Sequence, residues 1–144
     1  IWGGTLRDIQ RTITAGVRAT HADTRQSLMP RFGADRILKP AEIEALTDYT
    51  LTLYGKPGGP AAAAGQKLYA DNCVPCHGAA GQGVPDVGGP RLASRVHLYG
   101  DDRAAITAQL NNPRMGVMPN WNTRLDEAKI KSVTLYVHAL GGGQ

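Results

Sequence analysis

The segment Cys73-Val74-Pro75-Cys76-His77 contains the residues of this sequence that are best placed for chemistry. Two cysteines separated by two residues, with a histidine directly after them, form the attachment signature of a c-type haem. The two thiols can add to the two vinyl groups on one edge of the porphyrin, and the imidazole that follows can then reach the iron. The sequence therefore predicts one haem c, bound covalently through Cys73 and Cys76, with His77 as an axial iron ligand.

Three other interpretations of this motif compete with haem attachment. A thioredoxin-like redox pair would need strand-rich surroundings and a long helix after the motif, but Gly78 follows the histidine directly. A structural zinc site needs four nitrogen or sulfur ligands, and the chain has only 2 cysteines. A chance match is the third interpretation. The rest of the sequence favours haem over all three.

A haem that transfers electrons needs a second strong axial ligand, and a methionine opposite the histidine raises the reduction potential. Met118, followed by Pro119, is the predicted sixth ligand, and Met115 is its rival. Met29 also precedes a proline, and it would serve a first haem only if that domain were complete. A methionine that merely fills a core is the competing interpretation for each of the three.

Other residues are expected around the haem without being iron ligands. The ring N–H of a ligating histidine needs an acceptor, and the carbonyl of Pro90 is the natural candidate. Contacts with the haem propionates are expected from a further set, for each of which ordinary packing or surface exposure explains the residue equally well: Tyr99, Trp121, Arg91 and Arg95. The remaining histidines, His21, His97 and His138, are interpreted as non-ligands.

Composition indicates an all-α, loop-rich protein of one ordinary domain or two small ones. The chain has 144 residues, 42% of them hydrophobic, and helical spacing of apolar residues prevails over strand-like alternation. Net charge is +4 without clustered basic runs, so nucleic acid binding is not expected. We expect no membrane-spanning segment and no signal peptide. Helices are predicted at residues 5–17, 40–53, 61–72 and 101–111, and from Thr123 or Asp126 onward.

The chain also repeats itself. Ile1-Trp2-Gly3 matches Leu98-Tyr99-Gly100, and Met29-Pro30-Arg31-Phe32 matches Met118-Pro119-Asn120-Trp121. We therefore predict two tandem domains of one type: residues 1–55 as the back half of a first domain that lacks its haem-attachment motif, 56–60 as a linker, and 61–144 as a complete domain. The apolar stripe within 43–53 is expected to dock either on a second chain or on a surface of the intact domain.

Together these motifs resemble class I cytochrome c domains, and more closely the di-haem subunit of cbb3-type cytochrome c oxidases. The C-terminal haem domain of that subunit is matched by Asp71-Asn72-Cys73, Gly81-Gln82-Gly83 and Gly116-Val117-Met118-Pro119-Asn120-Trp121. The first repeat is similar to the back half of the subunit's first haem domain. The resemblance implies a cytochrome c fold, a periplasmic location with a membrane anchor, oxidase subunits as partners and a cytochrome as electron donor. The anchor and the first haem-attachment motif are absent from this sequence.

The function expected on these grounds is one-electron transfer by haem c to the haem-copper core of an oxidase. The chain by itself is not expected to be an enzyme. Two alternatives stay open. One is a cytochrome module of another periplasmic dehydrogenase, and the other is a haem sensor or peroxidase with an open sixth position.

Overall fold

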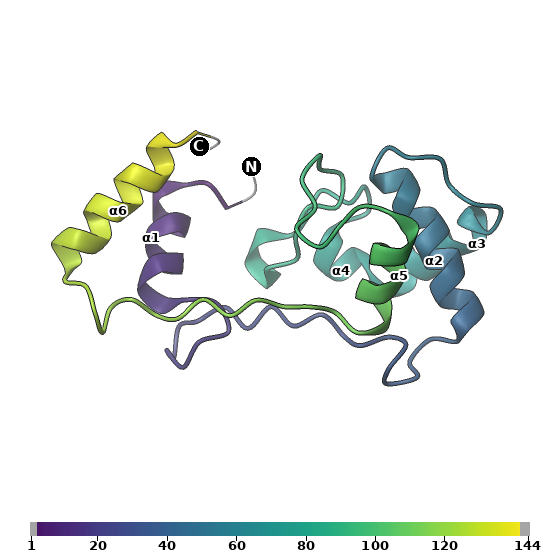
Figure 1. The fold of residues 1–144 in the computed structure, drawn as a ribbon, viewed down its shortest axis with the longest axis horizontal. Helices are drawn as coiled ribbons and strands as arrows, with labels where there is room; N and C mark the ends of the chain where they lie inside the picture. Colours follow the sequence, from purple (N-terminus) through teal and green to yellow (C-terminus); the bar gives the residue numbers. More distant parts are fainter. Residues whose placement is uncertain (1–2, 142–144) are drawn as a thin grey trace. The chain divides into compact units, whose positions relative to one another are not determined.

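In the computed structural model, which describes residues 3–141, the regular elements are helices, and only isolated β-bridges occur besides them. Figure 1 shows their order: α1 (Leu6–Ala15), α2 (Pro40–Leu53), α3 (Ala62–Asn72), α4 (Val74–His77), the 3-10 turn Pro85–Val87, α5 (Arg103–Asn111) and α6 (Glu127–Ala139). The predicted all-α class is confirmed. The repeat match at Ile1 and Trp2 lies outside the described residues.

Local sequence sets the helix ends. The side chains of Thr5, Asp102 and Asp126 accept hydrogen bonds from backbone N–H groups in the first turns of α1, α5 and α6. Proline at the first position starts α2. The observed bounds lie within two or three residues of the predicted ones, and Asp126 rather than Thr123 caps the last helix.

The described chain divides into two compact units that do not follow the predicted division at residues 56–60. One unit, the haem-motif unit, is Leu28–Arg114; the other, the paired-helix unit, combines the described residues up to Ser27 with those from Met115 onward. The predicted linker lies inside the haem-motif unit, between α2 and α3. Helices joined by a short connection commonly pack against each other, so here the Gly- and Pro-rich stretch acts as a helix connection.

In the haem-motif unit, α2 packs against both α3 and α5. The core contains Phe32, Ile43, Leu46, Leu51, Tyr69, Cys73, Ile106 and Leu110. A Cβ on Gly65 of α3 would overlap the backbone carbonyl of Ala45, so glycine is required for this close approach. The rings of Tyr49 and Tyr69 lie 5.2 Å apart. The 43–53 stripe therefore packs on α3 and α5 of the same chain, within one unit.

In the paired-helix unit, α1 packs against α6. Its buried side chains include Ile13, Ala15, Ile130 and Thr134. Of the apolar stripe predicted for the last helix, only Ile130 is buried, whereas Val133, Val137 and Leu140 are exposed. The physical reason is that α6 contacts the short α1, whereas its sequence counterpart α2 contacts two helices.

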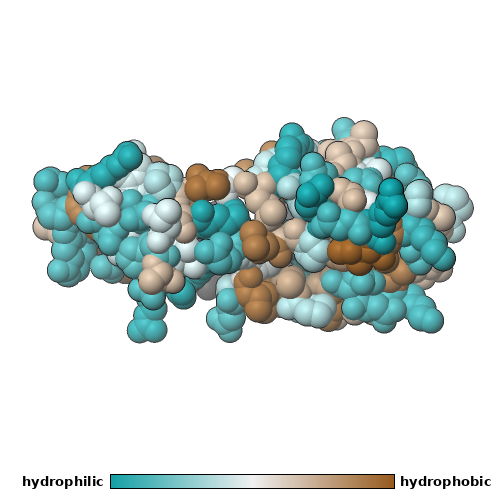
Figure 2. Space-filling model, turned by 90° about the horizontal axis from the view of Figure 1, so that it is seen from below, coloured by the Kyte–Doolittle hydropathy of each residue, from teal (hydrophilic) through white to brown (hydrophobic). Residues whose placement is uncertain are grey.

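Much of the face in Figure 2 is hydrophilic, with separate hydrophobic patches. Large apolar side chains are exposed in the segment between α4 and α5, at Val87, Val96 and Leu98. Within the described range, no helix has the length and apolar content needed to cross a bilayer.

Candidate haem c site

The turn from α3 into α4 places both cysteines and the histidine together. Cys73 ends α3, where its N–H donates to the carbonyl of Tyr69 at 2.8 Å. The Cys73 carbonyl then accepts from the N–H groups of Cys76 at 3.1 Å and His77 at 2.8 Å. Helical spacing of three and four residues brings these side chains to one side of the turn. Both cysteines are free thiols, Cys73 buried and Cys76 exposed.

Burial dominates the acid–base behaviour of the first thiol. It raises the pKa of Cys73 to about 11, and the neighbouring Cys76 adds a smaller contribution in the same direction. Cys73 is therefore a neutral thiol at physiological pH.

The ring of His77 is oriented by a backbone carbonyl, as the sequence suggested. Its Nδ1 lies 2.9 Å from the carbonyl oxygen of Pro90. A carbonyl oxygen only accepts, so Nδ1 must carry the proton, which leaves the lone pair of Nε2 for a metal. Burial lowers the pKa of His77, with the Pro90 hydrogen bond acting in the opposite sense. A neutral imidazole with a free Nε2 is the form that binds iron.

The glycine-rich loop after α4 brings Pro90 to the histidine. Gly83 N–H donates to the His77 carbonyl at 2.7 Å, and Val84 and Gly89 exchange backbone hydrogen bonds of 3.1 and 3.2 Å. A Cβ on Gly89 would overlap the Cys76 carbonyl. The loop therefore lies directly on the attachment turn, and this contact is what positions Pro90.

Sequence reasoning missed the role of Tyr69 at this site. Its side chain is only 2% exposed, and its hydroxyl donates to the carbonyl of Gly78 at 2.8 Å. The bond ties α3 to the residue that follows His77. Gly65 and Tyr69 lie four residues apart in the sequence, a spacing that places them on one face of a helix but does not reveal this hydrogen bond.

The three methionines fall in different units. Met29 belongs to the haem-motif unit, where it is partly buried and packs against the core cluster that contains Cys73. Met115 and Met118 belong to the paired-helix unit. There the N–H and carbonyl of Met118 bond to Val17 at 3.0 and 2.9 Å. Iron ligation by Met118 or Met115 stays a prediction.

The expected propionate contacts are likewise divided between the units. In the haem-motif unit, exposed Arg91 donates through Nε to the carbonyl of Ala93 at 2.9 Å, and Arg95 is also exposed. Tyr99 lies in the same unit, with the guanidinium of Arg114 5.0 Å from its ring centroid. Trp121 belongs to the paired-helix unit. A role for these four residues toward a haem stays a prediction.

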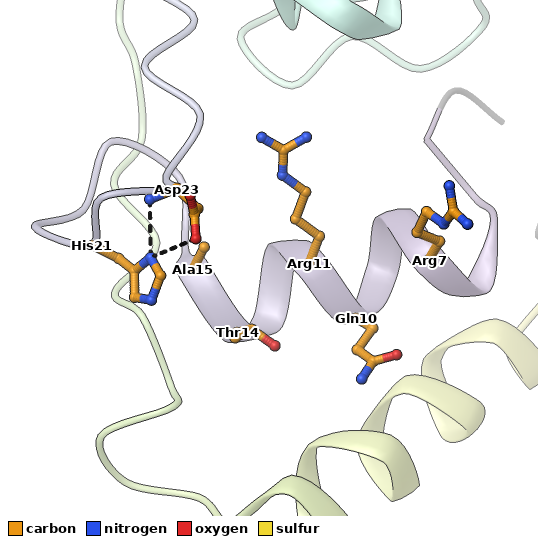
Figure 3. A pocket seen from close by; sticks show the side chains of 7 residues that line it. All are labelled: Arg7, Gln10, Arg11, Thr14, Ala15, His21 and Asp23. Carbon is orange, nitrogen blue, oxygen red and sulfur yellow. Dashed lines mark hydrogen bonds and ion pairs between the residues drawn. The ribbon is translucent and has the colours of Figure 1, made fainter.

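A cavity of about 260 Å³ lies beside α1, and none of the candidate haem residues lines it. Figure 3 shows its lining: Arg7, Gln10, Arg11, Thr14, Ala15, His21 and Asp23. Nδ1 of His21 accepts a hydrogen bond from the N–H of Asp23 at 3.0 Å. No cysteine lines this cavity, and among the described residues no cluster of three or more His, Cys, Asp or Glu could hold a metal ion.

The residues present fit a haem c. Two free thiols and a neutral, oriented imidazole lie on one turn of helix, which is the donor set that covalent attachment requires. Alternative metal chemistry at this turn would need further N or S donors, and none clusters there among residues 3–141.

Comparisons with known proteins point to one family. Residues 60–137 match the family model described as cytochrome c oxidase, cbb3-type, subunit III. The chain is 48% identical to a cbb3-type cytochrome c oxidase subunit FixP of Bradyrhizobium sp. (strain ORS 278) and 48% identical to a subunit CcoP of Cereibacter sphaeroides. A FixP of Bradyrhizobium diazoefficiens is 44% identical. Each alignment covers 100% of this chain and 50% of the relative, so the chain spans about half the length of these proteins.

Proposed function

Because the chain belongs to the family of cbb3-type cytochrome c oxidase subunit III, with more than half of its residues matched, we propose that it is a one-electron carrier. Members of this family bind haem c. In our proposal one haem is attached through Cys73 and Cys76, and His77 is its proximal ligand. When bound, the haem supplies an Fe(II)/Fe(III) couple.

The Nδ1 hydrogen bond of His77 to the Pro90 carbonyl is the observation that carries this proposal. It fixes the tautomer and the ring orientation, so that Nε2 is available to iron in both oxidation states. A proximal ligand that does not move keeps the cost of reorganisation during electron transfer low. Two further contacts hold the turn that carries His77: the hydrogen bond from Tyr69 to Gly78 and the close approach of Gly89 to Cys76.

We propose that the acceptor is the haem-copper core of a cbb3-type oxidase and that the donor is another cytochrome. Relatives of this chain are named as subunits of that oxidase, which supports the assignment. The proposed location is the periplasm, in association with a membrane complex. Proposed propionate contacts are Arg91, Arg95, Tyr99 and Trp121, and the sixth ligand is a methionine. Met118 is the proposed sixth ligand, and Met115 is its rival.

Production of the chain together with a haem-attachment system tests the first part of the proposal. The intact mass should rise by one covalently bound haem, and the pigment should cycle reversibly between ferrous and ferric forms. A Cys73→Ala/Cys76→Ala double variant should lose covalent pigment. A colourless wild-type chain with both thiols free would refute the proposal.

Electron delivery is tested by mixing the ferrous chain with a purified cbb3-type oxidase core in the presence of oxygen. Oxidation of the haem at a rate that depends on the core concentration is expected. Binding of CO to the ferrous haem, or turnover with peroxide, would show an open sixth position and favour the sensor or peroxidase alternative. Absence of electron transfer to the core would favour a dehydrogenase module.

A further inference from the structure

Two arginines of α1 line the cavity beside that helix without a carboxylate to balance them. Arg7 and Arg11 are four residues apart, and Figure 3 shows both side chains extending to the same side of α1. Among residues 3–141, no ion pair or hydrogen bond involves either side chain. Like charges at this spacing on a helix repel each other. The cavity therefore has a concentration of positive charge on one of its walls.

The one acidic residue of α1 is already engaged elsewhere. Asp8 accepts a hydrogen bond from the hydroxyl of Thr5 at 2.7 Å and forms an ion pair with Arg25 at 2.9 Å. Thr5 is the main cause of the low pKa of Asp8, and Arg11 makes the smallest contribution, through space. The guanidinium groups of the cavity are therefore left to bind a group from outside the chain.

A short turn after α1 adds a third donor to the lining. The N–H of Ala19 donates to the hydroxyl of Thr24, and the N–H of Thr24 donates to the carbonyl of His21, each at 3.1 Å. The N–H of Asp23 donates to Nδ1 of His21 at 3.0 Å. Because Nδ1 accepts this bond, the ring proton of the neutral imidazole is on Nε2. The turn thus fixes His21 as an N–H donor.

The rest of the lining does not cancel this positive charge. Asp23 is its only carboxylate; its side chain is 79% exposed and lies beside His21, with 3.9 Å between Oδ2 and Nδ1. Gln10 and Thr14 are neutral and extend toward α6 (Figure 3). The cavity of about 260 Å³ has space for several water molecules, and hence for a small ligand.

We propose that this cavity binds a small oxyanion of the phosphate class, held by the guanidinium groups of Arg7 and Arg11 and by Nε2–H of His21. The planar fork of a guanidinium group matches two oxygens of a phosphate, and such charge-assisted bonds are stronger than neutral ones. All three donors belong to the paired-helix unit. Binding therefore needs neither the attached haem nor electron transfer, and the inference does not rest on the proposed function.

Calorimetric titration of the haem-loaded 144-residue chain with inorganic phosphate, at an ionic strength held constant with chloride, tests the site. The wild-type chain should bind one phosphate, and Arg7→Gln and Arg11→Gln should each weaken the affinity roughly tenfold, because each removes a charged donor. Lys67→Gln is the control: it removes one positive charge from an exposed position of α3 in the other unit and should leave the affinity unchanged. Equal weakening in all three variants, or no binding to the wild-type chain, overturns the inference.

A second measurement covers the case in which a glutamine variant perturbs α1. In wild-type chain labelled with ¹⁵N in its arginine and histidine side chains, phosphate should shift the signals of Arg7, Arg11 and His21 along one saturating curve. Shifts of all exposed arginines without saturation would overturn the inference. Glycerol 3-phosphate, titrated in the same way, distinguishes the two sources of this chemistry: tighter binding of the ester identifies an organic phosphate as the ligand, and tighter binding of the ion identifies free phosphate.

Discussion

At the scale of single residues, the ring orientation of His77, the proposed iron ligand, depends on a backbone carbonyl thirteen residues later in the chain. The Pro90 oxygen holds the ring proton on Nδ1, and the loop that presents this oxygen rests on the carbonyl of Cys76 through Gly89. Neither contact could be made if a side chain stood between the loop and the turn. The orientation of the His77 ring therefore depends on Gly89, which has no side chain.

We predict that Gly89→Ala destabilises the haem-loaded protein by about 2 kcal/mol, because the added methyl group forces the loop away from Cys76. The displaced Pro90 carbonyl should also weaken its bond to His77 and shift the reduction potential. Thermal unfolding and a redox titration measure the two effects. Gly55→Ala is the control: its φ of 74° strains alanine, but no atom lies within 4 Å of the new Cβ. It should cost about 1 kcal/mol and leave the potential unchanged.

The two thiols of chain made without haem attachment should differ in reactivity. Only the thiolate reacts with alkylating agents, and a pKa of about 11 leaves Cys73 roughly 0.1% ionised at pH 8. We expect exposed Cys76 to be alkylated first, and the rate at Cys73 to rise about tenfold per pH unit until that pKa is reached. Mass spectrometry of peptides from timed samples gives both rates. Equal rates at pH 8 would contradict the burial of Cys73.

The hydrogen bond between His77 and the Pro90 carbonyl was predictable from the sequence, whereas haem attachment at Cys73 and Cys76 stays a prediction. Each of these lies in a short motif whose chemistry constrains its geometry. The bond from Tyr69 to Gly78 was not predictable, because it depends on the path of the chain through α4. Met118 as the sixth ligand, with Met115 as its rival, stays a prediction.

At the scale of elements, the association of α2 with α3 accounts for most of the core described for the haem-motif unit. Leu46→Ala should destabilise the protein by about 3 kcal/mol, because it removes a fully buried side chain and leaves a cavity. Leu135→Ala is the control on α6, where the side chain is exposed, and it should change stability by at most about 0.5 kcal/mol. Denaturant titrations followed by absorbance of the haem measure both. The reverse order of effects would show α6 on α3 in solution.

Helix positions followed from local signals, whereas helix pairing did not. A few adjacent residues determine where the helices begin: the caps Thr5, Asp102 and Asp126, and the proline that starts α2. The apolar stripes of α2 and α6 are nearly interchangeable, so they indicated a repeat without saying which helix joins α3. The distinction lies in Glu44 and Asp48 facing Arg103, a contact between residues more than fifty positions apart.

At the scale of the whole molecule, the two units differ in the depth of their cores. The haem-motif unit buries a cluster of eight side chains from four parts of the chain. The paired-helix unit has two short helices with a few buried side chains, so its described part has less apolar burial to offset the entropy of ordering. Its stability depends correspondingly more on polar contacts at the helix ends.

Acid should therefore unfold the paired-helix unit first. A hydrogen bond from Thr5 lowers the pKa of Asp8, with Arg25 acting in the same sense, while Lys129 and Lys131 lower the pKa values of Asp126 and Glu127. In the haem-motif unit, a hydrogen bond from Lys56 lowers the pKa of Asp101. A carboxylate whose folded pKa is depressed stabilises the protein above its unfolded pKa, and this stability is lost as pH falls through the folded value.

Most of the lowered carboxyl pKa values that the structure resolves thus belong to the paired-helix unit. On titration below about pH 4, helical circular dichroism should decrease in a first step while the haem absorbance stays unchanged, and the haem absorbance should change only at lower pH. Asp8→Asn should lower the neutral-pH stability of the first step and flatten its pH dependence. Asp86→Asn, an exposed substitution in the other unit, is the control and should alter neither. A single acid transition, with both signals changing together, would show that the units unfold cooperatively.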